Sequence, residues 1–159
     1  GRMEFGPRAL CHRSILYDCT DQETNKWLNN QLSRTEFMPF APVVRDIDAN
    51  DLFKNYDGGK YSAKHMTMTY DCKDEFINTY KAACHVDKTA RPQVINYIEQ
   101  PLMFDILTEY EHITGLKALI NTSFNLHNWP IVESFENAYE SWKTSNIQCL
   151  VIGNILIER

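Results

Sequence analysis

The sequence predicts an α/β (α+β) domain, with helices on the faces of a β-sheet. Segments with helical spacing alternate with short apolar segments, and no internal repeat interrupts the alternation. Composition agrees, because 43% of the 159 residues are hydrophobic and 23% are charged, which is ordinary for a protein with one buried core. We therefore expect a single domain over residues 1–159. The chain begins inside a dense motif, so we also expect it to be a fragment of a longer protein.

Helices are predicted where capping residues precede apolar residues at helical spacing. Residues 20–32 start with TDQE, which has the pattern of a capping box. Residues 101–114 start with proline and are followed by Gly115, which favours a helix with both of its ends marked. Shorter helical segments are expected at residues 49–53, 74–82 and 134–142.

Strands are predicted where side chains alternate, or form short apolar runs, between turn residues. Four strands are expected, at residues 43–45, 65–70, 92–98 and 116–120. Residues 149–157 are expected to form a hairpin around a Gly153-Asn154 turn. The order of the strands in the sheet does not follow from a single sequence.

The charge balance limits what the protein binds. The formal net charge is -5 and the pI is about 5.5, which argues against a nucleic-acid partner. No apolar run approaches the ~20 residues that span a bilayer, so no membrane partner is expected. The basic residues gather locally, which favours a small anionic substrate. Five cysteines without a C-x-x-C pair indicate reduced thiols in a cytoplasmic protein.

The opening segment GRMEFGPRALCHRS places three arginines among two glycines and a proline. Glycine and proline fix bends that other residues avoid. Arginines held on such a bend (Arg2, Arg8 and Arg13) present forked donors that suit carboxylate or phosphate groups. The alternative is a basic turn whose arginines pair with surface acids.

Two more clusters contain arginines in front of strands. PFAPVVR at residues 39–45 ends a rigid turn at Arg45, and Arg34 lies just upstream. HVDKTARPQ at residues 85–93 contains Arg91, which can contact phosphate oxygens together with its lysine and threonine neighbours. The alternatives are packing beside proline for the first cluster and an ordinary loop for the second.

A fourth cluster, NTSFN at residues 121–125, follows a buried strand, where ligands bind in open α/β sheets. Its alternative is local turn bonding by Asn and Ser side chains. A nucleophilic role for Cys11 beside His12 lacks a separate base, so we prefer Cys11 as a small space-filling residue. The histidines are scattered without ligand spacing, so no metal site is expected.

The clusters occur together in a fixed order. They are residues 1–10 and 13–16, 39–42, 85–93, 121–125 with 130–132, and 150–153. Together they resemble the C-terminal domain of the carbamoyltransferase family, which includes NodU-type nodulation proteins and the O-carbamoyltransferases of antibiotic biosynthesis. The resemblance covers the whole chain.

The resemblance implies a YrdC-like fold with a twisted mixed β-sheet. It also implies that the domain binds carbamoyl phosphate and ATP, with Mg²⁺ accompanying the ATP, and forms carbamoyl adenylate. An N-terminal carbamoyl-transfer domain of the same polypeptide, which carries a metal, would pass the carbamoyl group to a hydroxyl of a sugar-like acceptor. Whether the protein forms a homodimer stays open.

By motif, the resemblance assigns seven residues to carbamoyl phosphate or ATP. They are Arg8, Arg13, Arg34, Arg45, Arg91, Ser123 and Asn125. None is assigned as a certain catalytic residue, because forming an adenylate depends on positioning and charge neutralisation rather than on a protein nucleophile.

Several positions depart from the family pattern. Cys11 and Lys88 stand where glycine is usual, Asn128-Trp129 replaces Gly-Glu, and Met38 takes a position often held by arginine. If the positions of Cys11 and Lys88 need a positive φ, a side chain there strains the backbone. These departures keep an alternative open, a catalytically silent module that binds a nucleotide or anion, or a structural module of the same protein.

Overall fold

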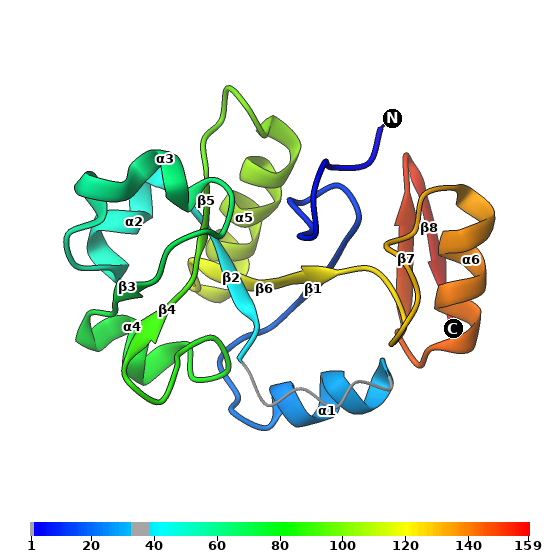
Figure 1. Cartoon of the computed structure of the whole chain (residues 1–159), viewed down its shortest axis with the longest axis horizontal. Helices are drawn as coiled ribbons and strands as arrows, with labels where there is room; N and C mark the ends of the chain where they lie inside the picture. Colours follow the sequence, from blue (N-terminus) through cyan, green and yellow to red (C-terminus); the bar gives the residue numbers. More distant parts are fainter. Residues whose placement is uncertain (1, 33–38) are drawn as a thin grey trace.

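The computed structural model describes residues 2–32 and 39–159. At its centre is a four-stranded mixed sheet with the strand order β1-β6-β2-β5 (Figure 1). The strands are β1 Ser14–Tyr17, β6 Ala118–Ser123, β2 Ala41–Arg45 and β5 Gln93–Ile95. β6 runs antiparallel to both β1 and β2, whereas β2 and β5 are parallel. The mixed sheet with flanking helices confirms the predicted fold class.

Two helices use opposite faces of this sheet. α1 (Thr24–Gln31) contributes Leu28 to the larger core, which also contains Ile120 of β6. α5 (Pro101–Thr114) contributes Leu107 to a second core with Leu119 of β6. Neighbouring residues of a strand point to opposite faces, so β6 separates the two cores. α5 has the predicted bounds, and within the described ranges no helix combines the length and hydropathy needed to cross a bilayer.

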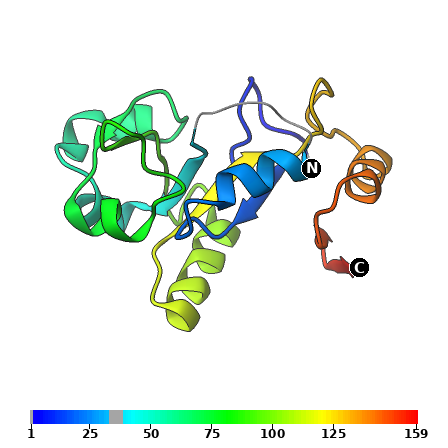
Figure 2. The ribbon, with the colours of Figure 1, turned by 90° about the horizontal axis from the view of Figure 1, so that it is seen from below.

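A group of short elements lies at the β5 side of the sheet (Figures 1 and 2). They are α2 Asp46–Leu52, a 3-10 turn Tyr56–Gly59, α3 Lys60–Ala63, β3 Tyr70–Asp71, α4 Asp74–Thr79 and β4 Thr89–Ala90. Phe76 joins them, since its ring centroid lies 5.0 Å from those of both Phe53 and Tyr80. β4 pairs with β3 and leads into the site described below.

The C-terminal elements lie at the opposite side, beyond β1 (Figure 2). α6 (Phe135–Thr144) is followed by a hairpin of β7 (Cys149–Ile152) and β8 (Ile155–Glu158). Ser134 caps α6 as predicted, because its side chain accepts a hydrogen bond from the backbone N–H of Asn137. The predicted hairpin is confirmed, with Gly153 at φ +58° in its turn.

Several local predictions were wrong or incomplete. The strand expected at residues 65–70 is reduced to Tyr70–Asp71, because Met66 has a φ of +55° that no strand accommodates. The capping box at Thr20 is absent, since its hydroxyl donates to Asp18 and α1 begins after Glu23. β1 was missed altogether.

Candidate functional site

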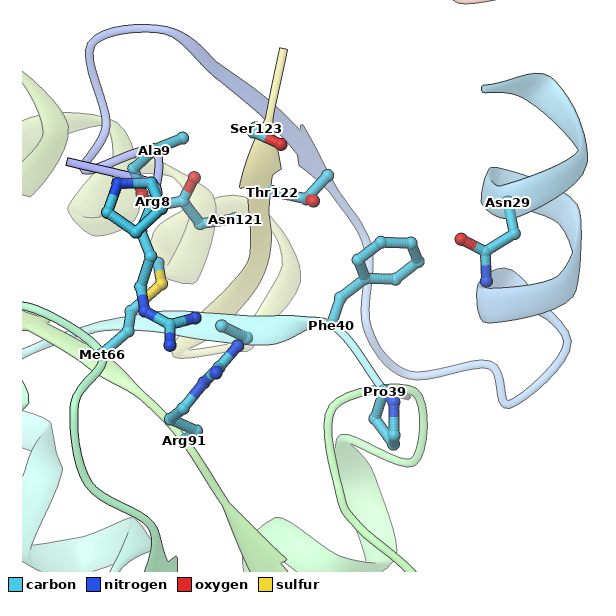
Figure 3. Close-up of a pocket in the computed structure, with 12 residues that line it drawn as sticks. Arg8, Ala9, Asn29, Pro39, Phe40, Met66, Arg91, Asn121, Thr122 and Ser123 are labelled. Carbon is cyan, nitrogen blue, oxygen red and sulfur yellow. The ribbon is translucent and has the colours of Figure 1, made fainter. Parts of the chain in front are cut away.

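A cavity of about 200 Å³ opens where β2 begins and β6 ends. Its walls come from the opening loop, the segment before β2, the segment after β4 and the end of β6. In Figure 3, Arg8 and Arg91 point toward each other on one side of the cavity, with Thr122 and Ser123 across from them. All four clusters singled out from the sequence therefore contribute to one site.

Arg8 and Arg91 give the cavity an uncompensated positive charge. Both side chains are half-buried, and Arg91 directly follows β4. Burial lowers the pKa of Arg91, and the nearby charge of Arg8 lowers it further. Within residues 2–32 and 39–159, neither guanidinium forms an ion pair or a hydrogen bond. Two like charges held together without a counter-charge favour the approach of an anion.

The opening loop that carries Arg8 is folded around the carboxylate of Glu4. Its Oε1 accepts hydrogen bonds from the backbone N–H groups of Leu10 at 2.7 Å, His12 at 3.0 Å and Arg13 at 3.0 Å. Burial raises the pKa of this carboxyl, but backbone hydrogen bonds outweigh burial and hold the pKa below its usual value. The sequence analysis missed this role, whose signal was a single acid in a basic loop.

A buried polar network attaches the opening loop to the sheet. Asn121, 1% exposed, donates from Nδ2 to the carbonyl of Ala9 at 3.2 Å and to Oε1 of Gln93 at 2.6 Å. The thiol of Cys11 donates to the same Gln93 oxygen at 3.2 Å. Burial, with a smaller effect of the Glu4 charge, raises the pKa of Cys11 to about 12. The thiol is therefore protonated at neutral pH, which fits a space-filling residue and disfavours a nucleophile.

The end of β6 also borders a second cavity of about 460 Å³. Ser123 and Pro7 line both cavities, whereas Asn125 lines only the second. The Ser123 hydroxyl donates to Oδ1 of Asn125 at 2.6 Å, and Nδ2 of Asn125 donates to the carbonyls of Leu126 at 3.0 Å and Trp129 at 2.9 Å. Local turn bonding is thus present, and it fixes two side chains that remain on cavity walls.

Arg13 lies apart from Arg8 and Arg91. Its guanidinium donates to the carbonyls of His12 at 3.3 Å and Glu133 at 3.4 Å. It lines a different cavity of about 650 Å³ between β1 and the C-terminal hairpin. Arg34 and Met38 lie outside the described residues.

The expectation that Arg45 contacts phosphate needs correction. Arg45 is only 3% exposed, and its Nε donates to Asp48 at 2.6 Å. Its other nitrogens bond to Thr108 at 2.9 Å and to Glu111, both on α5. Two carboxylates already neutralise this guanidinium, so Arg45 ties β2 to α5 instead of facing the cavity.

A family model described as "Carbamoyltransferase C-terminus" matches residues 1–159. The chain belongs to this family. Over its whole length it is 39% identical to Uncharacterized protein MJ1058 of Methanocaldococcus jannaschii, covering 26% of that protein. It is also 35% identical over its whole length to Nodulation protein NolO of Bradyrhizobium diazoefficiens, covering 29% of it. Nodulation protein U of Rhizobium tropici is 33% identical over 94% of this chain, which spans 25% of that protein.

A solved structure shares the fold of this carbamoyltransferase domain. It is full-length HypF in a phosphate- and nucleotide-bound form, which is 19% identical with a TM-score of 0.58. The match covers 83% of this chain and 17% of HypF. This likeness confirms the YrdC-like fold expected from the motifs.

The chain has a left-handed backbone at three positions where the resemblance to carbamoyltransferases implies glycine. φ is +77° at Cys11, +63° at Lys88 and +65° at Asn128. Glycine adopts these angles freely, whereas a residue with a side chain is strained there. The positive φ considered for Cys11 and Lys88 is confirmed, and Asn128 also has a positive φ.

Proposed function

We propose that this chain is the carbamoyl-activating domain of a longer, cytoplasmic O-carbamoyltransferase. The observation that carries the proposal is the pair Arg8 and Arg91, which face one cavity without a counter-charge in the described part of the chain. Carbamoyl phosphate and ATP are both polyanions, and bringing them together requires fixed cations. Membership of the carbamoyltransferase family supports carbamoyl as the group that is activated.

In the proposed reaction, water displaces phosphate from carbamoyl phosphate and gives carbamate. A carbamate oxygen then attacks the α-phosphorus of ATP. The bond from that phosphorus to the α,β-bridging oxygen breaks, and pyrophosphate leaves with the bonding electron pair. The product is carbamoyl adenylate, and Mg²⁺ bound with ATP supplies further charge neutralisation.

The chain contributes by positioning the two reactants and by supplying positive charge that offsets their repulsion. Arg8 and Arg91 offset the repulsion between the two anions, and their forked donors orient phosphate oxygens. Ser123 contacts the phosphate or the carbamoyl group from the end of β6, and Asn125 contacts the bound nucleotide from the adjoining cavity. Glu4 holds the loop that presents Arg8. Alignment of two bound reactants accounts for a large part of such a rate without a protein nucleophile.

The transfer step belongs to another part of the polypeptide. The chain spans 23–30% of the curated relatives that it matches over its whole length. We therefore assign the transfer of the carbamoyl group to an N-terminal domain, which would select a hydroxyl of a sugar-like acceptor. The isolated chain should then form the adenylate without transferring it.

A second candidate is a module that binds the nucleotide or anion without turnover. Side chains at two left-handed positions, Cys11 and Lys88, favour it, because they alter loops that border the site. Such a module would bind ATP but release no pyrophosphate. A purely structural module would bind no phosphate ligand.

The test is calorimetric titration with carbamoyl phosphate and with Mg²⁺-ATP, followed by a pyrophosphate-release assay. Arg91→Ala should weaken both affinities at least about tenfold, because a charged hydrogen-bond donor is lost from a half-buried site. Arg91→Lys should recover only part of the loss, since lysine lacks the fork. Lys26→Ala, an exposed cation on α1, is the matched control and should bind normally. Equal affinities for the wild type and Arg91→Ala would contradict the proposed site.

A further inference from the structure

We propose that the cavity of about 460 Å³ beside Trp129 holds the nucleoside end of a nucleotide, and that the Trp129 indole is the surface on which the base stacks. The inference rests on the proposed function, because it requires the phosphates of that nucleotide to lie at Arg8 and Arg91. It adds the position of the base and a residue that recognises it.

The volumes of the two cavities and the residues that they share indicate where the phosphates and the nucleoside lie. The cavity between Arg8 and Arg91 measures about 200 Å³, below the roughly 300–1,000 Å³ of most small-molecule sites. It has room for phosphate groups but not for a whole nucleotide. The larger cavity adjoins it, since Pro7 and Ser123 line both. A ligand with phosphates at the arginines therefore extends past Ser123 into the second cavity.

Trp129 differs from the other two tryptophans of the chain. Its side chain lines the second cavity and is 51% exposed. Trp27 stacks on Tyr17 with ring centroids 4.9 Å apart, and Trp142 is only 8% exposed. An aromatic face left open beside a polar cavity suits a flat heterocycle, because every base offers a π-face for stacking.

The backbone around Trp129 is fixed before any ligand arrives. Asn128 is left-handed, and the Trp129 N–H donates to the carbonyl of Leu126 at 3.1 Å. The Trp129 carbonyl accepts from Asn125 at 2.9 Å, and Pro130 restricts the next residue. The backbone that carries the indole is therefore already ordered, which lowers the entropic cost of binding.

Charge sets the direction of the ligand. Glu133 is exposed and lines the second cavity but not the cavity of Arg8 and Arg91. Its carboxylate repels phosphate and accepts hydrogen bonds from an exocyclic amino group or a ribose hydroxyl. The favoured orientation thus has the phosphates at Arg8 and Arg91 and the nucleoside near Glu133. The reverse orientation would place the phosphates beside the Glu133 carboxylate, which has the same sign of charge.

The test compares three probes, Mg²⁺-ATP, tripolyphosphate and adenosine, by calorimetry and tryptophan fluorescence. ATP should bind more tightly than tripolyphosphate, and ATP and adenosine should change tryptophan emission whereas tripolyphosphate should not. Trp129→Ala should weaken ATP binding at least about fivefold, since stacking on an aromatic ring is lost. Its affinity for tripolyphosphate should stay that of the wild type, which also shows that the variant is folded.

Two further variants sharpen the result. Trp129→Phe should keep most of the ATP affinity and lose the emission change, because phenylalanine still stacks. Tyr61→Ala removes an aromatic side chain that is 76% exposed and outside both cavities, and it should behave as the wild type. If Trp129→Ala binds ATP as the wild type does while tripolyphosphate binds, this inference alone is overturned. If the wild type binds neither ATP nor tripolyphosphate, the proposed function falls with it.

Discussion

Replacing Lys88 with glycine should raise the free energy of unfolding. φ at Lys88 is +63°, and the backbone is held there from both sides. Its N–H donates to the carbonyl of His85 at 2.9 Å, and its carbonyl accepts from the N–H of Cys72 at 2.9 Å. The side chain is exposed and forms no hydrogen bond or ion pair with the residues that the structure describes. The substitution therefore changes backbone strain and little else.

The expected gain follows from two opposing effects. A side chain on a left-handed residue costs roughly 1–2 kcal/mol. Glycine removes this strain but gives the unfolded chain more freedom, which lowers the stability by about 0.4–1 kcal/mol. The net gain is about 0.5–1 kcal/mol, which corresponds to a rise in Tm of about 1–4 °C for a domain of this length.

Urea and thermal unfolding of three proteins measure the gain. Lys88→Ala is the matched control, because it removes the long side chain but keeps the β-carbon and the strain. It should stay within about 0.5 kcal/mol of the wild type. A glycine variant no more stable than the alanine variant would refute the reasoning, since the left-handed angle would then carry no cost.

Three other substitutions test the scaffold of the site. Glu4→Gln should destabilise the chain by about 2 kcal/mol and weaken carbamoyl phosphate binding. The folded-state pKa of Glu4 is lowered from 4.5, so its stabilisation is present above that value and is lost as pH falls through the folded pKa. The difference between the wild type and Glu4→Gln in urea unfolding should shrink as the pH is lowered, and a constant difference would contradict this. Asp48→Asn should cost about 3 kcal/mol, because buried Arg45 loses a charged partner, while calorimetry shows unchanged carbamoyl phosphate binding. Ser134→Ala should lower the stability by about 1 kcal/mol through loss of the α6 cap, and thermal unfolding without that loss would show that the cap contributes nothing.

Local signals explain which elements were predictable. Local residues mark both α5 and the β7–β8 hairpin. Pro101 begins α5, Gly115 ends it, and Gly153 forms the turn of the hairpin. The alternation at residues 65–70 was misleading, because Met66 adopts a left-handed angle in a turn after α3. β1 is only four residues long and pairs with a strand more than a hundred positions away, so nothing local marks it.

The site residues also fall into those that sequence motifs indicate and those whose role only the folded chain reveals. Arg8, Arg91 and Ser123, which the motifs singled out, line one cavity, the two arginines from loops and Ser123 from the end of β6. Arg45 was misplaced because its partners lie on α2 and on α5, a pairing that spacing does not reveal. Glu4 was overlooked for a similar reason, since a carboxylate that accepts backbone hydrogen bonds is recognised only after the loop has folded.

The pairing of β1 with β6 fixes the point at which the opening loop ends, so the length of that loop matters. Ser14 lies opposite Ser123, and the opening loop runs from Glu4 to Ser14 before that pairing begins. A shift of one residue along β1 would turn every side chain of that strand to the other face. An extra residue between Glu4 and Ser14 would instead leave the strand in place and displace Arg8 relative to Ser123. The number of residues in this loop therefore matters to the proposed anion site as much as the arginine that it carries.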